Sequence, residues 1–550
     1  KGGSEQCEAA LTRFFITTLT RHESNMKSIL AALTLAAASP ARATRDSCSA
    51  VAGKDKVDCG VVGTNQPECE GKGCCWQPAP SGSAAPWCFY KSGAAPTCPL
   101  EYSSKGAPFS DEEVTTMRAF FLNNINVDGS GAVVAAPDYN TPGGSYYFHW
   151  ERDGALSMQA LLRTADSVAG VKTQMDAYVG WVGKVQQETD PHGQSVLAEP
   201  KYMIPNGSVF AGGWCRPQND GPGLRSHTLI DYATALAEEG NADAGSKYSP
   251  ADLWALIKID LDWQAANWQQ TGCDLWEEIR SDDFFWNRFT MRAALTKGAA
   301  FAKLQGDDTR ASIYAGAAQA VEATLGEHFA NGFVFETQSR QKDAAVICAF
   351  NDGYLGDGVF APTSEEVAGT VSTLNELFCS TFAINQNDTA AGLPGILYGR
   401  YQGDNYAGGN PWILLTSALA ELLYSGATEI AQSNGAALTA AAQAKWADAL
   451  GLAAGHKARV GGAELDMADA MAGAGDGVLT RLRHHVVDNG FHLNEQIDRN
   501  TGVSMAAKDL TWSYATTLKA VHKRSQYVAL REAMTGNQSS GLRGAAAQEE

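Results

Sequence analysis

The chain has 550 residues, and its 61 acidic side chains outnumber its 42 lysines and arginines, which gives a formal net charge of −19. A balance this acidic disfavours nucleic-acid phosphate as a partner and favours a soluble protein that binds neutral ligands. The length allows several domains, since one domain usually takes about 100–200 residues.

The N-terminal 43 residues predict a segment that the mature protein lacks. Residues 26–43, MKSILAALTLAAASPARA, combine a lysine, an apolar run too short to span a bilayer and a small-x-small end, as signal peptides do. Signal peptides begin at an initiator methionine, so residues 1–25 are interpreted as an upstream translation artefact. The mature chain is expected to start near Thr44 and to be extracellular rather than vacuolar or lysosomal, and no later segment is predicted to cross a membrane.

Six cysteines lie within residues 44–92, a Gly- and Pro-rich stretch too small to fold by burial alone. Zinc binding is the competing explanation, but the adjacent Cys74 and Cys75 suit disulfides better than paired CxxC ligands. The order Cys48, DCG, C, GCCW and PWCFY resembles a trefoil (P-type) domain. This resemblance, and not the spacing alone, implies the pairs Cys48–Cys75, Cys59–Cys74 and Cys69–Cys88.

After a linker at 93–107, residues 108–534 predict a second, mainly helical domain. In SPADLWALIKIDLDWQAANWQQTG, Ser249-Pro250 supplies a helix start, an apolar face repeats every four residues, and Gly272 is the expected end. Long Gly-, Pro- and aromatic-rich loops at 136–150, 198–224 and 399–411 interrupt the helices, and such loops commonly carry binding residues. The tail at 535–550 is predicted to be disordered.

Two adjacent glutamates, Glu277 and Glu278, stand in the aromatic stretch CDLWEEIRSDDFFWNRF, residues 273–289. A solvated helix start is the ordinary interpretation, because acidic residues in a first turn suit the helix dipole. Among apolar neighbours, however, two such carboxylates repel each other and lose hydration, so folding gains nothing obvious from the pair. The rest of the sequence decides between structure and function.

Five stretches occur in one order along the helical domain: YYFHWERDG (146–154), GGWCRPQNDGPGLR (212–225), CDLWEE (273–278), GRYQGDNYAGGNPW (399–412) and NEQIDRNTGVSMAAKDLTWSYA (494–515). Together they resemble glycoside hydrolase family 15, the glucoamylases. The resemblance implies an (α/α)6 barrel with the site at one end of its inner ring of helices. It also implies inverting hydrolysis of terminal α-1,4-linked glucose, and more slowly of α-1,6-linked glucose, from an α-glucan by a monomer without metal or cofactor.

The same resemblance makes Glu277 the general acid and Glu495, in NEQID, the general base. An acid must hold its proton near neutral pH, which the neighbouring charge of Glu278 would favour. Glu278 itself resembles a residue that hydrogen-bonds sugar hydroxyls. Inversion requires the two catalytic carboxyl groups to stand roughly 6.5–9.5 Å apart, so that a water fits between base and sugar. Glu421 and Glu365-Glu366 are interpreted as structural.

The other substrate-binding residues follow from the resemblance. Arg152 and Asp153 resemble a clamp on the terminal sugar's hydroxyls, and Arg400 resembles its third member. The aromatic residues that match positions lining the site are Tyr146, Trp150, Trp214, Trp268, Tyr406 and Trp512. Without the resemblance, core packing would be the preferred interpretation of each aromatic side chain.

Several cysteines and one loop depart from the family pattern. Cys273 stands where the family usually has a tyrosine and Cys215 where it has a glycine; because both border the site, a Cys215–Cys273 disulfide is predicted over two buried thiols. RYQGD replaces the RYPED of the fungal enzymes. Cys348 and Cys379 form a candidate pair, and Cys98 has no evident partner.

The remaining features are weaker. Asn206, Asn387 and Asn537 head N-x-S/T sequons and are glycosylation candidates. NVDGSG at 126–131 lacks the later ligands of a calcium loop and is interpreted as a turn. Nothing of domain size follows the last predicted helix, so no C-terminal starch-binding domain is expected.

Two alternatives to a glucoamylase stay open. One is another family 15 hydrolase, of the trehalase or glucodextranase type. The other is a non-catalytic glycan-binding relative, which would not need both Glu277 and Glu495.

Overall fold

The computed structural model describes residues 48–49, 51–53, 56–60, 64–80, 85–91, 93–239, 245–452 and 467–546, with side chains described up to Met534. The expected signal peptide at 26–43, the preceding residues 1–25 and the expected start near Thr44 lie outside these ranges. The described residues belong to one compact unit.

The trefoil region is small and cross-linked by disulfides. It contains helix α1 (Gln66–Gly71), whose N-terminus carries a capping box between Asn65 and Glu68, and an antiparallel pair of strands, β1 (Cys75–Trp76) and β2 (Cys88–Phe89). The structure contains the pairs Cys48–Cys75, Cys59–Cys74 and Cys69–Cys88. Four of these cysteines form its buried apolar cluster, so cross-links take the place of a large core.

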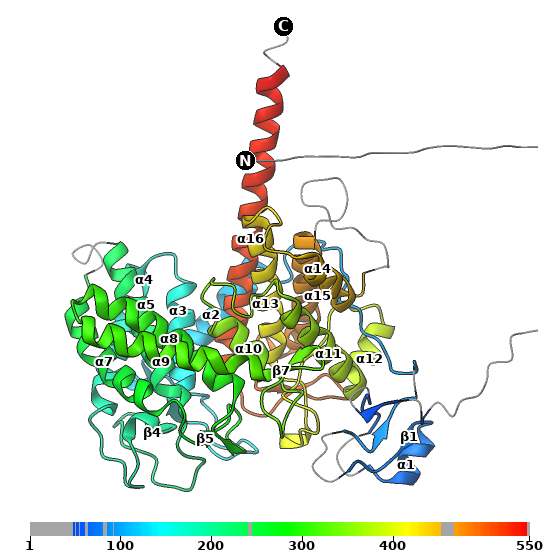
Figure 1. Ribbon diagram of the computed structural model, residues 1–550, viewed down its shortest axis with the longest axis horizontal. Helices are drawn as coiled ribbons and strands as arrows, with labels where there is room; N and C mark the ends of the chain where they lie inside the picture. The colour runs from blue at the N-terminus through cyan, green and yellow to red at the C-terminus, as the bar shows by residue number, and fades with distance from the viewer. Residues whose placement is uncertain are drawn as a thin grey trace, which may run out of the picture. The chain divides into compact units, whose positions relative to one another are not determined.

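Six helices of the described chain form a closed inner ring. In chain order they are α3 (Glu151–Arg163), α5 (Asp220–Glu238), α8 (Phe285–Leu304), α10 (Ala345–Asp352), α13 (Ile413–Gln432) and α16 (Thr511–Ala546), which Figure 1 shows from cyan to red. Each packs against the next, and α16 packs back against α3. The fold is therefore the expected (α/α)6 barrel.

The other helices lie outside this ring or between its members. They are α2 (Asp111–Asn123), α4 (Val168–Val185), α7 (Pro250–Asn267), α9 (Asp308–Leu325), α11 (Glu365–Thr381), α12 (Ala383–Ala390), α14 (Ala440–Leu450) and α15 (Met467–Val486). Short 3-10 helices are η2 (Val127–Gly129), η3 (Val196–Ala198), η4 (Gly326–His328), η5 (Tyr406–Gly408) and η6 (Val487–Asn489). The NVDGSG stretch thus contains η2.

Four two-stranded antiparallel ribbons stand in the loops of the barrel. They pair β3 (Phe148–Trp150) with β4 (Lys201–Met203), β5 (Gly272–Cys273) with β6 (Arg280–Ser281), β7 (Phe329–Ala330) with β8 (Phe333–Val334), and β9 (Gln496–Ile497) with β10 (Ser504–Met505). The β3–β4 register places Trp150 opposite Lys201. These ribbons fix the loops from which the site is built.

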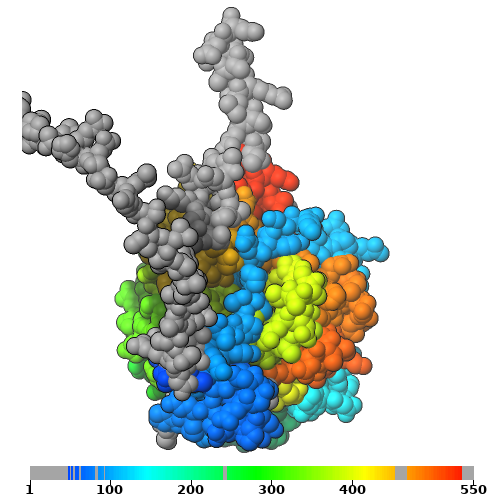
Figure 2. Space-filling model, turned by 90° about the vertical axis from the view of Figure 1, so that its right-hand side faces the viewer, coloured from blue at the N-terminus to red at the C-terminus, as the bar shows by residue number. Residues whose placement is uncertain are grey.

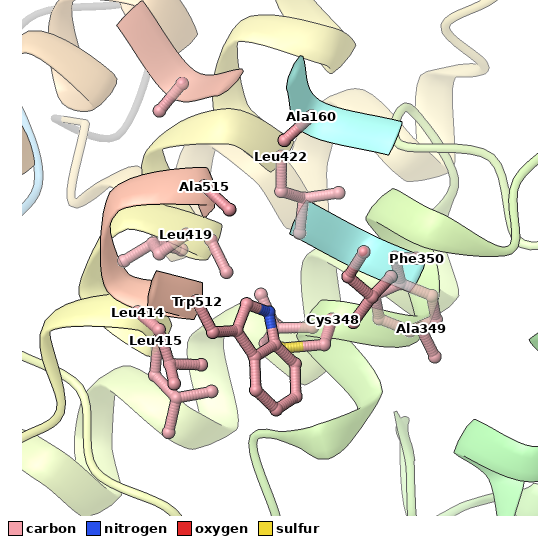
Figure 3. Packing of buried hydrophobic residues seen from close by; sticks show 14 of the residues in the cluster. Ala160, Cys348, Ala349, Phe350, Leu414, Leu415, Leu419, Leu422, Trp512 and Ala515 are labelled. Carbon is pink, nitrogen blue, oxygen red and sulfur yellow. The ribbon is translucent and has the colours of Figure 1, made fainter. Parts of the chain in front are cut away.

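The core of the barrel lies between the inner helices. Leu414, Leu415, Leu419 and Leu422 of α13 belong to the same buried cluster as Trp512 at the start of α16 (Figure 3). Among the described helices, α13 has the length and apolar composition of a membrane-crossing segment, but 83% of its most apolar window is buried within the protein. That burial is expected of a helix enclosed on all sides by a globular core.

One cysteine expectation is wrong. Cys379 pairs with Cys98, not with Cys348, which is a buried free thiol. The segment that follows the trefoil region runs over the surface beside α12 and α15 (Figure 2), where Tyr102 contacts Gly473 of α15. This path brings Cys98 to α11 across 281 residues of sequence, a proximity that no local pattern encodes.

Two helix ends also differ from expectation. The Ser249 cap forms as predicted, but α7 ends at Asn267, and Gly272 belongs to β5 instead. At the C-terminus, α16 continues to Ala546, into the stretch expected to be disordered from residue 535. Extending an existing helix costs less than nucleating one, so a weakly helical sequence can continue a strong helix.

Candidate active site

The loops that precede the inner helices meet at a cavity of about 240 Å³. Eleven of the twelve residues that the sequence assigns to acid, base or substrate binding line it: Tyr146, Trp150, Arg152, Asp153, Trp214, Glu277, Glu278, Arg400, Tyr406, Glu495 and Trp512. Several inner helices start there, including α3 with Arg152 and Asp153 in its first turn. Trp268 is the exception, because it caps the end of α7 and packs against the core instead.

Glu277 lies in the turn between β5 and β6, not in a helix, so the helix-start interpretation of the Glu-Glu pair is wrong. The side chain of Asp274 builds this turn by accepting hydrogen bonds from the backbone N–H groups of Glu278 (2.7 Å) and Ile279 (2.9 Å). Glu277 has a φ of +66°, a left-handed conformation that side chains rarely adopt. Such strain persists only where the surroundings enforce it, and it is common at active sites.

Three donors converge on the Glu277 carboxylate, and we call them the Glu277 cradle. Oε1 accepts from Trp150 Nε1 at 2.8 Å and from Arg152 Nη2 at 3.0 Å, while Oε2 accepts from Trp214 Nε1 at 2.6 Å. All three N–H groups stabilise the ionised carboxylate, which is the form that a general acid reaches after it has given up its proton.

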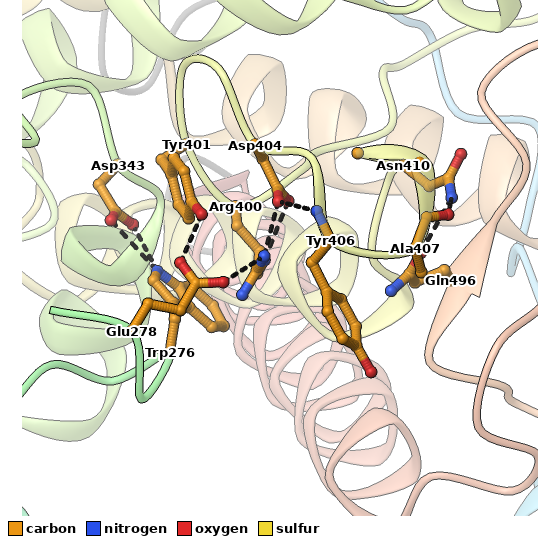
Figure 4. Close-up of polar contacts among 12 residues, drawn as sticks. Trp276, Glu278, Asp343, Arg400, Tyr401, Asp404, Tyr406, Ala407, Asn410 and Gln496 are labelled. Atoms are coloured by element: carbon orange, nitrogen blue, oxygen red, sulfur yellow. Dashed lines mark hydrogen bonds and ion pairs between the residues drawn. The ribbon is translucent and has the colours of Figure 1, made fainter. Parts of the chain in front are cut away.

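Glu278 points toward a different set of partners (Figure 4). Oε1 pairs with Arg400 Nη2 at 2.9 Å, and Oε2 accepts from Arg340 Nη2 at 3.0 Å and from the Tyr401 hydroxyl. Two guanidinium groups therefore compensate the charge of Glu278. These pairings reduce the influence of the Glu278 charge on Glu277. The sequence analysis expected that charge to help Glu277 keep its proton, because the two residues are adjacent.

Glu495 reaches the cavity from the loop before β9, and it is only 1% exposed. Oε1 accepts from the Tyr146 hydroxyl at 2.8 Å, and Oε2 accepts from Gln496 Nε2 at 3.0 Å. Burial raises the pKa of the Glu495 carboxyl, whereas the Tyr146 hydrogen bond and the Arg400 charge lower it. The site thus favours the neutral form of Glu495, with Tyr146 as the main opposing group.

Tyr146 and Trp150 connect the two carboxyl groups. Tyr146 bonds Glu495 and Trp150 bonds Glu277, and the ring centroids of these two aromatic residues are 5.5 Å apart. Within the described part of the chain, Glu277 and Glu495 make no hydrogen bond to each other. The two carboxyl groups therefore bond different members of one aromatic pair, and their separation of roughly 6.5–9.5 Å stays a prediction.

The three expected clamp residues differ in what they leave for a ligand. Arg152 directs its Nη atoms to Asp220 (2.9 Å), Gln218 (3.1 Å) and Glu277, so it chiefly orients the protein. Among the described residues, the Asp153 carboxyl makes no hydrogen bond to another side chain and accepts one from its own backbone N–H, and burial raises its pKa to about 7 although the charge of Arg152 opposes this. Its carboxyl is therefore free to bond a ligand hydroxyl.

Arg400 is held on one edge and open on another. Nε and Nη2 donate to the two oxygens of Asp404 at 2.9 and 2.6 Å, and no bond of Nη1 is found in the part of the chain that the structure describes. Its guanidinium carbon lies 5.1 Å from the ring centroid of Tyr406 and 5.2 Å from that of Trp412. The arrangement suits one further hydrogen bond to a ligand placed among aromatic rings.

Two cavity-lining tryptophans, Trp276 and Trp412, are missing from the predicted set. Their rings lie 5.7 Å apart, and Trp276 Nε1 donates to Asp343 at 2.9 Å (Figure 4). Both stand inside the stretches quoted for the family resemblance, DLWEE and GNPW. Their position in those stretches was the signal that could have found them.

The Cys215–Cys273 disulfide is present in the structure. It joins the loop that carries Trp214 to strand β5, which leads to Glu277, so it connects one member of the cradle to the acid. Asn206 and Asn387 are exposed, whereas the side chain of Asn537 lies outside the described residues. Glycosylation at all three stays a prediction. Glu421 is buried in α13, outside the cavity, 3.3 Å from Lys519.

Comparisons with known proteins show which families the chain resembles. Residues 117–522 match the family model of glycosyl hydrolases family 15, and residues 48–91 match the trefoil (P-type) domain. A glucoamylase from Blastobotrys adeninivorans is 32% identical over 457 residues, which cover 76% of this chain and 71% of the relative. The structure of a glucoamylase from Saccharomycopsis fibuligera has 25% identity and a TM-score of 0.68, covering 78% of this chain and 99% of that one. The glucoamylase structure from Hormoconis resinae has 27% identity and a TM-score of 0.66, covering 76% and 73% of the two chains.

Proposed function

Because the chain belongs to glycosyl hydrolases family 15, we propose that it removes glucose from the non-reducing ends of α-1,4-linked glucans, and more slowly at α-1,6 branches, with inversion. It is a glycoside hydrolase of the glucoamylase type. The observation that carries the proposal is that Glu277 and Glu495 line one cavity and bond different members of the Tyr146–Trp150 pair.

The proposed mechanism is a single displacement. Glu277 gives its proton to the glycosidic oxygen while Glu495 takes a proton from the water that attacks the anomeric carbon on the other face of the sugar. Glu277 ends ionised, inside the three N–H donors of the cradle, and Glu495 ends neutral, in a buried position. Each surrounding therefore suits the form in which its carboxyl group ends the reaction, ionised for Glu277 and neutral for Glu495.

Action at a chain end is supported by the size and lining of the cavity. Its volume of about 240 Å³ is less than the roughly 300–1,000 Å³ of typical ligand sites, so it suits a terminal sugar better than a long chain segment. Asp153 and Arg400 Nη1 are the charged groups left to grip hydroxyls. A hydroxyl bonded to a charged group contributes about 1.5–3 kcal/mol, enough to discriminate between sugar epimers.

Secretion is part of the proposal. The described residues contain five disulfides, Cys48–Cys75, Cys59–Cys74, Cys69–Cys88, Cys98–Cys379 and Cys215–Cys273, and such density is typical of oxidising compartments. We infer that the enzyme acts outside the cell as a monomer on starch- or glycogen-type glucans.

The test is proton NMR of the sugar newly released from maltoheptaose, using the wild-type chain and the Glu277→Gln and Glu495→Gln variants. We expect β-glucose to appear first, and each variant to lose activity by about 10²–10⁴-fold. The exposed Glu365 on α11 supplies the matched control, Glu365→Gln, which should keep wild-type activity. Release of α-glucose or of longer sugars would overturn the inverting exo mechanism. Cleavage of trehalose or an α-1,6-glucan in place of maltoheptaose would reassign the substrate, and binding without cleavage would indicate a glycan-binding protein.

A further inference from the structure

Lys201 is a buried lysine that sits behind the Glu277 cradle. It lies in β4 opposite Trp150 and is 2% exposed. In the described part of the molecule its Nζ forms no hydrogen bond and no ion pair. It does not line the cavity either, so it is not placed to contact a substrate.

Four aromatic rings surround the Lys201 ammonium instead, and we call them the aromatic cage. Nζ lies 3.2 Å from the ring centroid of Trp214, 4.2 Å from Phe210, 4.3 Å from Trp150 and 4.7 Å from Phe148. A cation is attracted to the negative face of each ring, and the attraction is strongest where water is excluded. The ammonium therefore draws all four rings toward one point.

The rings of the cage also contact one another. Trp150 and Trp214 have centroids 5.9 Å apart at 68°, and Phe148 and Phe210 are 5.1 Å apart at 69°, both edge-to-face. Phe148 meets Trp150 at 5.9 Å and Phe210 meets Trp214 at 6.2 Å in the same manner. The cage is thus a closed set, in which a shift of one ring displaces the others.

The two tryptophans of the cage are also the two indole donors of the cradle. Their ring faces meet Lys201, and their Nε1–H groups point at opposite oxygens of Glu277, at 2.8 and 2.6 Å. The two indoles in contact with the Lys201 ammonium therefore supply two of the three hydrogen bonds that hold the Glu277 carboxylate.

The charges near Lys201 leave Glu277 as its main counter-charge. Glu199 and Arg216 also face the ammonium, but they pair with each other at 2.7 Å. Burial lowers the pKa of Lys201 to about 8, and the negative charge of Glu277 opposes that shift. Lys201 is therefore positively charged below about pH 8. Glu277 faces Arg152 and Asp153 on its other sides, and Glu278 adjoins it in the chain.

We propose that Lys201 is a positioning residue for the hydrolysis: its ammonium, held in the aromatic cage, orients the indole donors of Glu277 and adds a positive charge that stabilises the ionised carboxylate. The inference rests on the proposed role of Glu277 as general acid. It assigns a role in catalysis to a side chain that touches neither the substrate nor the acid directly.

The test compares Lys201→Met, which keeps the length of the side chain but removes its charge, with Lys201→Arg, which keeps the charge. For Lys201→Met we expect kcat to fall by on the order of tenfold to a hundredfold with little change in KM, because donors to the acid are displaced. The basic limb of the kcat profile should move up by about one pH unit, because loss of a nearby cation favours the protonated acid. Lys201→Arg should restore the position of that limb.

Lys184 provides the matched control, because it is exposed and its Nζ lies 5.8 Å from the ring centroid of Trp181, away from the cavity. Lys184→Met should leave kcat and both limbs unchanged. Thermal melting of every variant separates lost folding from lost positioning. A basic limb that stays in place in Lys201→Met would overturn the inference, whatever happens to kcat. Glu277→Gln is assayed in parallel: if it keeps full activity, the acid assignment fails, whereas an inactive Glu277→Gln beside an unaltered Lys201→Met refutes only the role of Lys201.

Discussion

The two carboxyl groups of the cavity stand in opposite surroundings. Glu277 has a partly accessible side chain and takes three N–H donors, two of them from indoles. Glu495 is buried and accepts from one hydroxyl, one side-chain amide and the backbone N–H of Ala507. The N–H donors around Glu277 are groups that stabilise negative charge on an oxygen, whereas burial raises the pKa of the Glu495 carboxyl to about 7. Before the reaction, a general acid must be protonated and a general base must be ionised. The two environments instead suit the forms that follow proton transfer, an ionised acid and a protonated base. This difference between the two carboxyl groups indicates that the site is complementary to charges that develop during the reaction.

The largest expected effect is a difference between the Glu277 and Glu495 variants when the leaving group of the substrate is changed. With α-glucosyl fluoride, whose leaving group needs little protonation, Glu277→Gln should recover most of the activity that it loses on maltoheptaose, about 10²–10⁴-fold. Glu495→Gln should stay inactive on both substrates, because the attacking water still needs a base. Initial rates of fluoride and glucose release measure the two cases. Equal recovery in both variants would remove the distinction between the two carboxyl groups.

Removing one donor on the Glu277 side should have the next largest effect. Trp214→Phe keeps a ring in the aromatic cage but deletes the N–H donor to Oε2 at 2.6 Å. A hydrogen bond to a charged group contributes about 1.5–3 kcal/mol, so kcat should fall by roughly tenfold to a hundredfold. The basic limb should move to higher pH, since the ionised acid is less stabilised. Steady-state kinetics from about pH 4 to 8, which should include the acidic and basic limbs of the pH–rate profile, test this prediction. A basic limb that stays at the wild-type pH would contradict it.

The corresponding change on the Glu495 side should be milder. Tyr146→Phe deletes the hydroxyl that lowers the pKa of Glu495, so that pKa should rise further. The base must be ionised to act, and the acid limb of kcat/KM should therefore move to higher pH, by about 1–2 units for one hydrogen bond to a charged group. A shift to lower pH would contradict the assignment. Tyr406→Phe is the control, because the Tyr406 hydroxyl contacts Tyr146 at 2.9 Å, whereas the hydroxyl that bonds Glu495 belongs to Tyr146.

The smallest effect on chemistry should come from the disulfide that joins the two sides of the cradle. Replacing both Cys215 and Cys273 by serine should lower the free energy of unfolding by about 2–4 kcal/mol and change kcat by less than about threefold, because hydrogen bonds still hold Trp214 and Glu277. Replacing the Cys98–Cys379 pair serves as a control far along the chain from these loops. Calorimetry and assays at 25 °C measure both; a large loss of kcat only in the first variant would make that disulfide part of the catalytic geometry.

Prediction from the sequence succeeded where contacts are local or carried by a motif. The helical class, the Ser249 cap and the assembly of eleven site residues in one cavity follow from such patterns. It failed where tertiary packing decides. Trp268 ends α7 on the core side, Cys98 reaches α11 over the surface, and Arg340, which compensates Glu278, comes from a loop without any recognisable motif. The position of Lys201 beside the site could not be predicted for the same reason, because only the β3–β4 register brings it opposite Trp150.

The closed ring of inner helices also determines when the barrel can close during synthesis of the chain. Its first member, α3, finds its last neighbour only in α16, whose first residue is Thr511. A chain still being synthesised must therefore hold most of the barrel open, with the apolar side of α3 uncovered, until the final helix emerges. Arg152 and Asp153, at the start of α3, are synthesised long before Trp512. The cavity that these three residues line can therefore form only when translation is nearly complete. An early stop before α16 would thus leave an exposed seam for chaperones to recognise, not a smaller enzyme.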